Sequence, residues 1–266
     1  MLFVNSELRE TSGTRRQVEP EPEPGSDQAH RMTRMTLAWR GRAPTVAAMT
    51  RLVLIRHGEA QSHLDGVVGG DQGCSGLSDL GRRQATALRD RLAATGELGE
   101  VEGLYASSLP RAHETAEIIA PALGDLTIKV ERDLREFDPG PEADGRPWEE
   151  IERDYPREVW DAYRPRVPGA ETWALFGVRV GAVLRDIASR HDGTVVVACH
   201  GGVIEQSVVT LFGLPANGEL SSFSIANTSI TEWVRLGPDA DTWRPGGDWR
   251  LMRLNDAAHL AGVAPS

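Results

Sequence analysis

Cysteine is scarce in this 266-residue sequence, which contains only Cys74 and Cys199. The two lie far apart and neither belongs to a CxxC pattern, so neither a disulfide framework nor a zinc cluster is indicated. A chain of this kind suits a reducing compartment, and we expect a cytoplasmic protein. Cys199 ends an apolar run, which favours a small buried side chain over a reactive thiol.

Positive charge is also in deficit, because 29 Lys and Arg residues face 39 Asp and Glu residues and the formal net charge is −10. Nucleic acids and anionic membranes bind proteins that carry a basic surface, so we expect neither as a partner. Residues 32–48 also hold no continuous apolar stretch of the length that a signal peptide or a membrane helix requires.

The first 48 residues differ from the rest of the chain. Residues 19–26 read EPEPEPGS, an acidic and proline-rich tract without side chains from which to build a core. We expect residues 1–48 to be a disordered N-terminal extension and residues 49–266 to form one domain. The hydrophobic share of 40% and the charged share of 26% suit a globular domain with a sizeable core.

Strand and helix patterns alternate along the folded part. Short apolar runs at 52–55, 101–106 and 194–198 are typical of strands buried on both faces. A short strand is predicted at 127–130, and two or three strands within 222–254. Helices are predicted at 77–95 (capped by Ser78), 110–123, 149–163, 171–189 and 203–211. This alternation predicts an α/β fold whose mostly parallel sheet is covered on both faces.

Reactive side chains gather directly after three of the predicted strands. The sequence reads RHGE at 56–59, SSLPRA at 107–112 and CHGG at 199–202. Ligands in such folds bind beyond the carboxyl ends of the strands. Two histidines and two arginines that emerge at one edge of one sheet are hard to explain as packing, so we predict a functional site there.

The chemistry of these side chains favours phosphoryl transfer. A neutral imidazole is a good nucleophile near pH 7, and histidine can form covalent intermediates. Arginine offers a planar fork that matches phosphate, and phosphoryl transfer needs little beyond positioning and charge stabilisation. Backbone N–H groups at the start of the helix after Gly202 can also face an anion. The sequence has no metal-binding motif, so we expect no metal, and the positive charge must come from arginine and histidine gathered in a pocket.

Eight segments, in order, carry a resemblance to a known family. They are RHGE at 56–59, LSDLGRRQA at 77–85, YASSLPRAHETA at 105–116, LREFDPG at 134–140, PGAET at 168–172, ACHGGVI at 198–204, NTSITEW at 227–233 and LNDAAHL at 254–260. Together they resemble the histidine phosphatase superfamily, with its phosphoglycerate mutase-like fold, from about residue 51 to residue 260. The resemblance implies a three-layer α/β/α sandwich, a catalytic domain at 49–266, and neither a metal nor an organic cofactor. By analogy with the family it also suggests a homodimer.

The resemblance implies a role for each matching residue. His57 matches the nucleophile, and Arg56 and Arg111 match the phosphate-binding arginines. His200 matches the second pocket histidine, which binds the phosphoryl oxygens. Glu136 matches the general acid that protonates the leaving alcohol and then activates water. A carboxyl group in a pocket can have its pKa raised toward neutrality, which suits both tasks.

Three further residues belong to the predicted site. Gly201 is expected to bind phosphate through its backbone. Asp138 is a lesser candidate for the proton donor. His63 stands where the family pattern RHGExxxN has an asparagine that contacts the phosphate. A histidine there could donate to a phosphate oxygen, contact a different part of the substrate, or lie on the surface.

Three functions fit this sequence. The leading hypothesis is a phosphatase-branch enzyme that hydrolyses a small phosphorylated metabolite. A cofactor-dependent phosphoglycerate mutase uses the same phosphohistidine, but such mutases usually carry NxxFTGW-like and ERHYG-like stretches. This chain has HLDGVVGG and LREFDPG there instead. A non-catalytic member that binds a phosphorylated ligand would be marked by loss of His57 or His200, and both are present.

The substrate itself is not fixed by the sequence. In this fold it is set by loops, here at 60–76, 132–168 and 214–226, which are too irregular for side-chain geometry to be inferred. Three tryptophans in or near the variable segments are candidate walls of the substrate pocket: Trp148, Trp160 and Trp173.

Overall fold

Six strands form the central sheet of this protein, seen in a computed structural model that describes residues 50–156, 161–215, 224–236 and 248–263. The strands are β1 (Thr50–Arg56), β2 (Val101–Ser107), β3 (Ile128–Glu131), β4 (Thr194–Cys199), β5 (Ile230–Arg235) and β6 (Trp249–Asp256). Their order in the sheet is β3-β2-β4-β1-β5-β6. The predicted extension at 1–48 and the side chain of Trp160 lie outside the described residues.

The sheet is mostly parallel, as predicted. β3, β2, β4 and β1 run parallel to one another, β5 pairs antiparallel with β1, and β6 pairs antiparallel with β5. The register of β1 and β4 runs from Arg51 opposite Thr194 to Arg56 opposite Cys199. His57 and His200, the next residues of each strand, therefore leave the sheet side by side.

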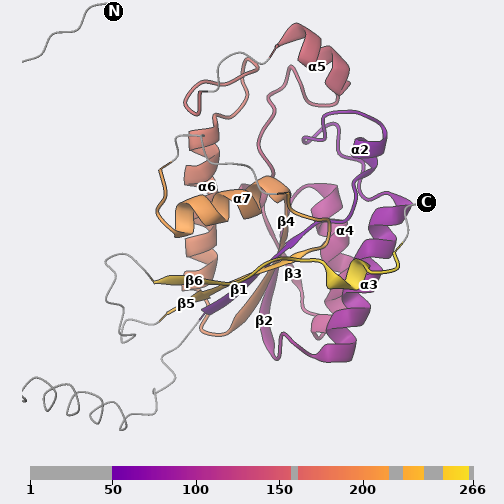
Figure 1. The fold of residues 1–266 in the computed structure, drawn as a ribbon, viewed down its shortest axis with the longest axis vertical. Coiled ribbons are helices and arrows are strands. Elements are labelled where there is room, and N and C mark those ends of the chain that lie inside the picture. The colour runs from indigo at the N-terminus through magenta and orange to yellow at the C-terminus, as the bar shows by residue number, and fades with distance from the viewer. Residues whose placement is uncertain (1–49, 157–160, 216–223, 237–247, 264–266) are drawn as a thin grey trace, which may run out of the picture. The chain divides into compact units, whose positions relative to one another are not determined.

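Side chains of β1 alternate between two cores, one on each face of the sheet. Leu52 and Leu54 pack with α6 (Trp173–Ser189) and α7 (Gly201–Leu211). Val53 and Ile55 pack on the other face with α3 (Asp79–Thr95) and α4 (Pro110–Ile119). Helices thus cover both faces of the sheet (Figure 1), which is the predicted three-layer α/β/α sandwich.

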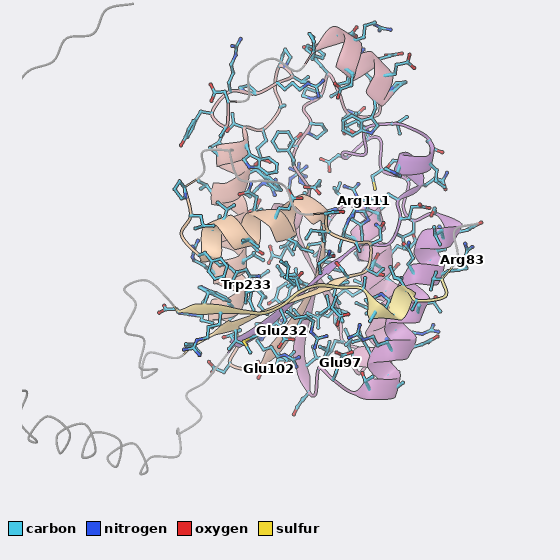
Figure 2. The ribbon with its side chains drawn as sticks, viewed as in Figure 1. Arg83, Glu97, Glu102, Arg111, Glu232 and Trp233 are labelled. Carbon is cyan, nitrogen blue, oxygen red and sulfur yellow. The ribbon has the colours of Figure 1, made fainter. Side chains whose placement is uncertain are left out.

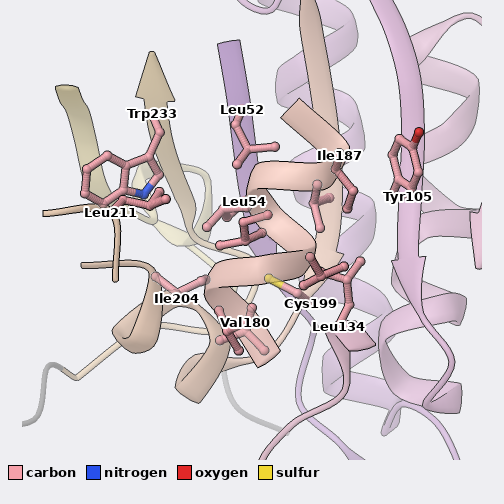
Figure 3. Packing of buried hydrophobic residues seen from close by; sticks show 14 of the residues in the cluster. Leu52, Leu54, Tyr105, Leu134, Val180, Ile187, Cys199, Ile204, Leu211 and Trp233 are labelled. Carbon is pink, nitrogen blue, oxygen red and sulfur yellow. The ribbon is translucent and has the colours of Figure 1, made fainter. Parts of the chain in front are cut away.

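The core beneath α6 and α7 holds the largest buried side chains (Figure 3). Trp233 is fully buried, and its indole N–H donates to Ser207 Oγ over 3.1 Å, so its polar atom has a partner. Cys199 is fully buried in the same core, as predicted, and burial raises the pKa of its thiol.

Capping side chains fix where two of the long helices begin. Ser78 Oγ accepts the N–H of Gly81 at 3.0 Å and caps α3, as predicted. The hydroxyl of Thr172 accepts the N–H of Leu175 at 3.2 Å and caps α6. Hydroxyl caps satisfy N–H groups that have no acceptor inside the helix.

Two predicted helices are shorter in the structure. The helix predicted at 110–123 ends as α4 at Ile119, and the 3₁₀ helix η1 (Ala120–Leu123) continues it. The helix predicted at 149–163 was too long, because α5 spans only Trp148–Asp154. Pro156 explains this end, since proline lacks the N–H for the next turn and disfavours helical geometry at the residue before it.

Shorter helical turns complete the described part of the chain. They are α2 (Gln61–Leu64), η2 (Arg132–Leu134) and η3 (Ala258–Leu260). Among the described helices, none combines the length and the apolar character that a membrane-spanning helix needs.

Candidate active site

Three strand ends bring the predicted residues together at one edge of the sheet. β1 ends at Arg56 and leads into His57, α4 carries Arg111 in its first turn after β2, and His200 lies between β4 and the start of α7. Arg111 Nε lies 3.1 Å from His57 Nε2, and the ring centroids of His57 and His200 are 5.1 Å apart. Figure 2 shows Arg111 at this edge of the sheet, and Glu97 and Glu102 at the opposite one.

His57 is held in the tautomer that a nucleophile needs. Its Nδ1 lies 2.5 Å from the carbonyl oxygen of Gly58, which can only accept, so Nδ1 carries the proton. Nε2 accepts from Arg111 and keeps the lone pair. Burial, followed by the positive charges of Arg111 and Arg56, lowers the pKa of His57 well below its usual value. The imidazole is therefore neutral, and its Nε2 carries a lone pair on which the Arg111 N–H rests in this structure.

Backbone contacts fix the turn that carries His57. Its N–H donates to the carbonyl of Cys199 at 2.9 Å, and its carbonyl accepts from Asn227 Nδ2 at 3.0 Å. Gly58 packs directly on the backbone of Gly81, and an added Cβ would lie within the contact distance of the Gly81 carbonyl. Glycine at both positions lets α3 approach this turn.

Arg111 is buried, with 5% of its surface exposed, and bridges His57 to a loop. Its Nη1 donates to the carbonyl of Gly69 at 2.7 Å while its Nε donates to His57. Two hydrogen bonds thus hold the guanidinium beside His57, and its other N–H groups are left for further acceptors.

Asp144 shapes the loop that holds Arg111. Its carboxylate accepts from the backbone N–H groups of Gly70, Gln72 and Gly73 at 2.9, 2.8 and 2.9 Å. These hydrogen bonds fix the conformation of the loop at 69–73. The Gly69 carbonyl of this loop then accepts a hydrogen bond from Arg111. No role was predicted for Asp144, because this contact joins segments more than 70 residues apart.

His200 is fully buried beside His57. Its Nε2 lies 2.8 Å from Ser107 Oγ, at the end of β2, whereas its Nδ1 has no partner in the described part of the chain. Burial, followed by the positive charge of Arg111, lowers the pKa of His200 well below its usual value. Ser107 lies in the SSLPRA segment, but its contact with His200 was not predicted.

Arg56 presents a second nitrogen without a partner. Its Nη1 donates to the carbonyl of Ile225, but its buried Nε has no acceptor among the residues described. Buried polar atoms are nearly always paired, so unpaired nitrogens of Arg56 and His200 at one site point to a ligand with acceptor oxygens. The backbone of Gly201 adjoins this place, since an added Cβ would lie 3.5 Å from Arg56 Nε.

Glu136 lies at the N-terminus of α7, next to these cations. Its Oε2 accepts the N–H of Gly202 at 3.0 Å and its Oε1 accepts the N–H of Phe137 at 2.9 Å. A side chain at residue 202 would collide with the Glu136 carboxylate, so the glycine there permits the approach. Asp138, the lesser candidate, accepts from Gly140 N–H at 3.0 Å and so caps its own loop.

Two more ionisable groups stand near the centre. His63 lies on α2 and is exposed, yet its charge contributes to lowering the pKa of His57. Glu205, on α7, is half-buried, and burial together with the negative charge of Glu136 raises its pKa to about 7 against the opposing effect of Arg56. Glu205 was not predicted, because no motif marks it. Within the described ranges no three His, Cys, Asp or Glu side chains are grouped as metal ligands would be.

A neutral histidine framed by two arginines and a second histidine is the arrangement of a phosphate-binding site with a built-in nucleophile. Comparison with known proteins agrees with this class. The family model "Histidine phosphatase superfamily (branch 1)" matches residues 52–251, and the chain belongs to that family.

Individual relatives include both mutase-like proteins and phosphatases. The chain is 31% identical to "Phosphoglycerate mutase-like protein 4" of Arabidopsis thaliana, over 79% of this chain and 86% of that protein. It is 27% identical to a "Metal-independent phosphoserine phosphatase" of the same plant, over 85% and 89%. A solved mycobacterial glucosyl-3-phosphoglycerate phosphatase superposes with a TM-score of 0.63 at 27% identity, over 78% and 99%. The family and these phosphatases support an enzyme that hydrolyses phosphate esters.

Proposed function

We propose that this protein is a phosphomonoesterase that hydrolyses a small phosphorylated metabolite through a phosphohistidine on His57. The observation that carries the proposal is the neutral His57 ring, with its Nε2 lone pair facing Arg111 and its proton held by the Gly58 carbonyl. Arg56, Arg111, His200 and the Gly201 backbone surround the same place and would hold the phosphoryl oxygens.

The first step forms the phosphohistidine. Nε2 of His57 attacks phosphorus, the bond from phosphorus to the ester oxygen breaks, and Glu136 gives its proton to the leaving alcohol. Arg111 turns its N–H groups from Nε2 to the phosphoryl oxygens as the N–P bond forms. Charge on those oxygens is then matched by two guanidinium groups in a buried site, where such interactions are strong.

The second step returns the enzyme to its starting state. The Glu136 carboxylate takes a proton from water, the resulting hydroxide oxygen bonds to phosphorus, and the N–P bond breaks. Inorganic phosphate leaves, His57 is neutral again, and Glu136 is protonated. No metal is required by this scheme, because Arg56 and Arg111 supply the positive charge.

A phosphoglycerate mutase is the second candidate, favoured by the names of two relatives, the mutase-like plant protein and a "Probable phosphoglycerate mutase GpmB" of Enterobacter sp. that is 30% identical. A mutase would return the phosphoryl group to the substrate instead of passing it to water. Incubation with 3-phosphoglycerate separates the two, since a phosphatase releases inorganic phosphate and a mutase forms 2-phosphoglycerate.

Hydrolysis of p-nitrophenyl phosphate, measured from pH 4 to 9 with EDTA present, tests the proposal. We expect turnover in the wild type and its loss in His57→Ala. A panel of phosphoserine, 3-phosphoglycerate and sugar phosphates then identifies the substrate. Turnover that survives His57→Ala would reject the phosphohistidine route. Cytoplasmic location, homodimer formation and the domain boundary at residue 49 stay predictions from the sequence.

A further inference from the structure

The segment that carries Glu136 has no regular structure of its own. Residues 135–139 belong to neither a helix nor a strand, so their backbone carbonyl groups need donors from elsewhere. Arg179, on α6, supplies several of these donors. Its Nη1 donates to the carbonyls of Asp133 and Arg135 at 2.7 and 3.0 Å, and its Nη2 donates to the carbonyl of Glu136 at 3.3 Å. One guanidinium thus binds three carbonyl groups of the chain that leads into the candidate proton donor.

Glu171, which lies just before α6, is the ionic partner of Arg179. Nε binds Oε1 at 2.9 Å and Nη2 binds Oε2 at 2.7 Å, and only 15% and 13% of the two side chains are exposed. A charge so far buried requires a partner of this kind. Glu171 also contacts Asp138, because its Oε2 accepts the N–H of Asp138 at 3.3 Å and its own N–H donates to the Asp138 carbonyl at 3.0 Å. The pair therefore binds the backbone on both sides of Glu136.

Phe176 connects this ion pair to the start of α7. The guanidinium carbon of Arg179 lies 5.0 Å from the centroid of the fully buried Phe176 ring, which is a cation–π distance. An added Cβ on Gly202 would lie 3.0 Å from Phe176 Cε1, so the same ring packs on the first turn of α7. There the N–H of Gly202 donates to Glu136 Oε2 at 3.0 Å. As a result, α6 holds the backbone of Glu136 and α7 holds its carboxyl group.

The position of a proton donor decides how well it works. It must come within hydrogen-bond reach of the leaving oxygen, and a displacement of about 1 Å can cost ~10²-fold in rate. We propose that Arg179 and Glu171 are positioning residues, which fix the backbone at 133–138 so that Glu136 can pass its proton to the ester oxygen. This inference rests on the proposed function. Neither residue touches a reacting atom in this scheme.

Crystal structures of three variants test the positioning without any turnover. We expect the segment 133–138 to move in Arg179→Met, so that Glu136 Oε2 leaves hydrogen-bond distance of the Gly202 N–H. Glu171→Gln keeps the shape of the side chain and should cause a smaller movement, so it serves if Arg179→Met does not fold. The matched control is Arg185→Met, an exposed arginine further along α6, which should leave Glu136 in place. An unmoved Glu136 carboxyl group in both test variants would overturn the proposal.

Two esters then separate positioning from general damage to the site. We would compare kcat/KM, which covers only the steps up to release of the leaving group. With glycerol phosphate, whose alcohol needs a proton to leave, Arg179→Met should lower kcat/KM by ~10²-fold. With p-nitrophenyl phosphate, whose nitrophenolate leaves unprotonated, kcat/KM should stay close to the wild-type value. Glu171→Gln should show the same contrast with a smaller loss, and Arg185→Met should show none. Equal losses with both esters in Arg179→Met would contradict the positioning role.

Glu136→Gln distinguishes a failure of this inference from a failure of the proposed function. If Glu136→Gln loses kcat/KM equally with both esters, Glu136 is not the proton donor and the proposed mechanism is wrong. If Glu136→Gln shows the contrast between the esters and Arg179→Met does not, the positioning role of Arg179 and Glu171 alone is wrong.

Discussion

Arg111 contacts His57 Nε2, and in the proposed mechanism its guanidinium also binds the phosphoryl group. We predict that Arg111→Ala lowers kcat/KM by about 10²–10³-fold, the usual cost of losing a donor that stabilises transition-state charge. Its charge also contributes to the low pKa of His57. The acid limb of the pH profile should therefore move to higher pH in this variant.

The matched control for Arg111 is Arg89→Ala, an arginine on α3 that pairs with Asp90 on the helix surface. It should leave both the rate and the pH profile unchanged. If Arg111→Ala lost less than about tenfold in kcat/KM, the residue would not stabilise the transition state as proposed.

At the residue scale, sequence motifs predicted four residues of the site, because each lies at or shortly after the end of a strand whose burial is readable from its apolar run. They are Arg56, His57, Arg111 and His200. The contact of Ser107 with His200 and the place of Glu205 were not predictable in this way. The first depends on β2 and β4 being neighbours in the sheet, and the second on how α7 is rotated about its axis. A short stretch of sequence determines neither of these.

At the element scale, the loop at 69–73 depends on a single side chain. Asp144 accepts three backbone N–H groups of this loop, and the loop presents Gly69 to Arg111. We predict that Asp144→Ala lowers kcat/KM by ~10²-fold, because a shift of about 1 Å in a positioned group can have that effect. Steady-state kinetics and the inhibition constant of vanadate, a phosphate mimic, measure it.

Asp90→Asn, which removes a carboxylate from the exposed surface of α3, is the control for Asp144. It should keep wild-type kinetics and vanadate inhibition. An Asp144→Ala enzyme with unaltered vanadate inhibition and rate would show that Arg111 keeps its place without the loop contact.

The sequence predicted which segments are helices and which are strands more accurately than it predicted the residues at which helices end. The strands at 52–55 and 194–198 were clear, since continuous apolar runs of that length suit strands covered on both faces. The end of the helix predicted at 149–163 was wrong, because α5 ends at Asp154 and Pro156 disfavours helical geometry at the residue before it. Turns such as α2, with only four residues, carry too little periodicity to be predicted.

At the scale of the whole molecule, an ion-pair cluster joins the C-terminal part of α3 and the residues after it to β6. Arg91 binds Glu97 and Asp256 over 2.7 Å each, and Arg253 binds both acids as well. Hydrogen bonds from Arg91 lower the pKa of Asp256 despite its partial burial. For Glu97, burial alone would raise the pKa, but hydrogen bonds from Arg91 and Arg253 outweigh it.

This cluster predicts how stability depends on pH. A carboxylate whose pKa is lower in the folded state stabilises the fold above its unfolded pKa, about 3.9 for Asp, and loses this effect as the pH falls below it. Asp256→Asn should therefore be less stable than wild type at neutral pH, with a difference that shrinks below about pH 4. Urea unfolding across this range measures it, and a difference that stays constant to pH 2 would contradict the account.

The central claim is that His57 carries the phosphoryl group, and trapping that intermediate tests it most directly. Glu136→Gln should form the phosphohistidine from p-nitrophenyl phosphate, whose leaving group needs no proton, but should break it down slowly because no base activates water. After an alkaline quench, mass spectrometry of peptides should find one phosphoryl group on His57 and none in His57→Ala. A phosphoryl group on another residue, or steady hydrolysis by the wild type with no trapped intermediate in Glu136→Gln, would contradict the account.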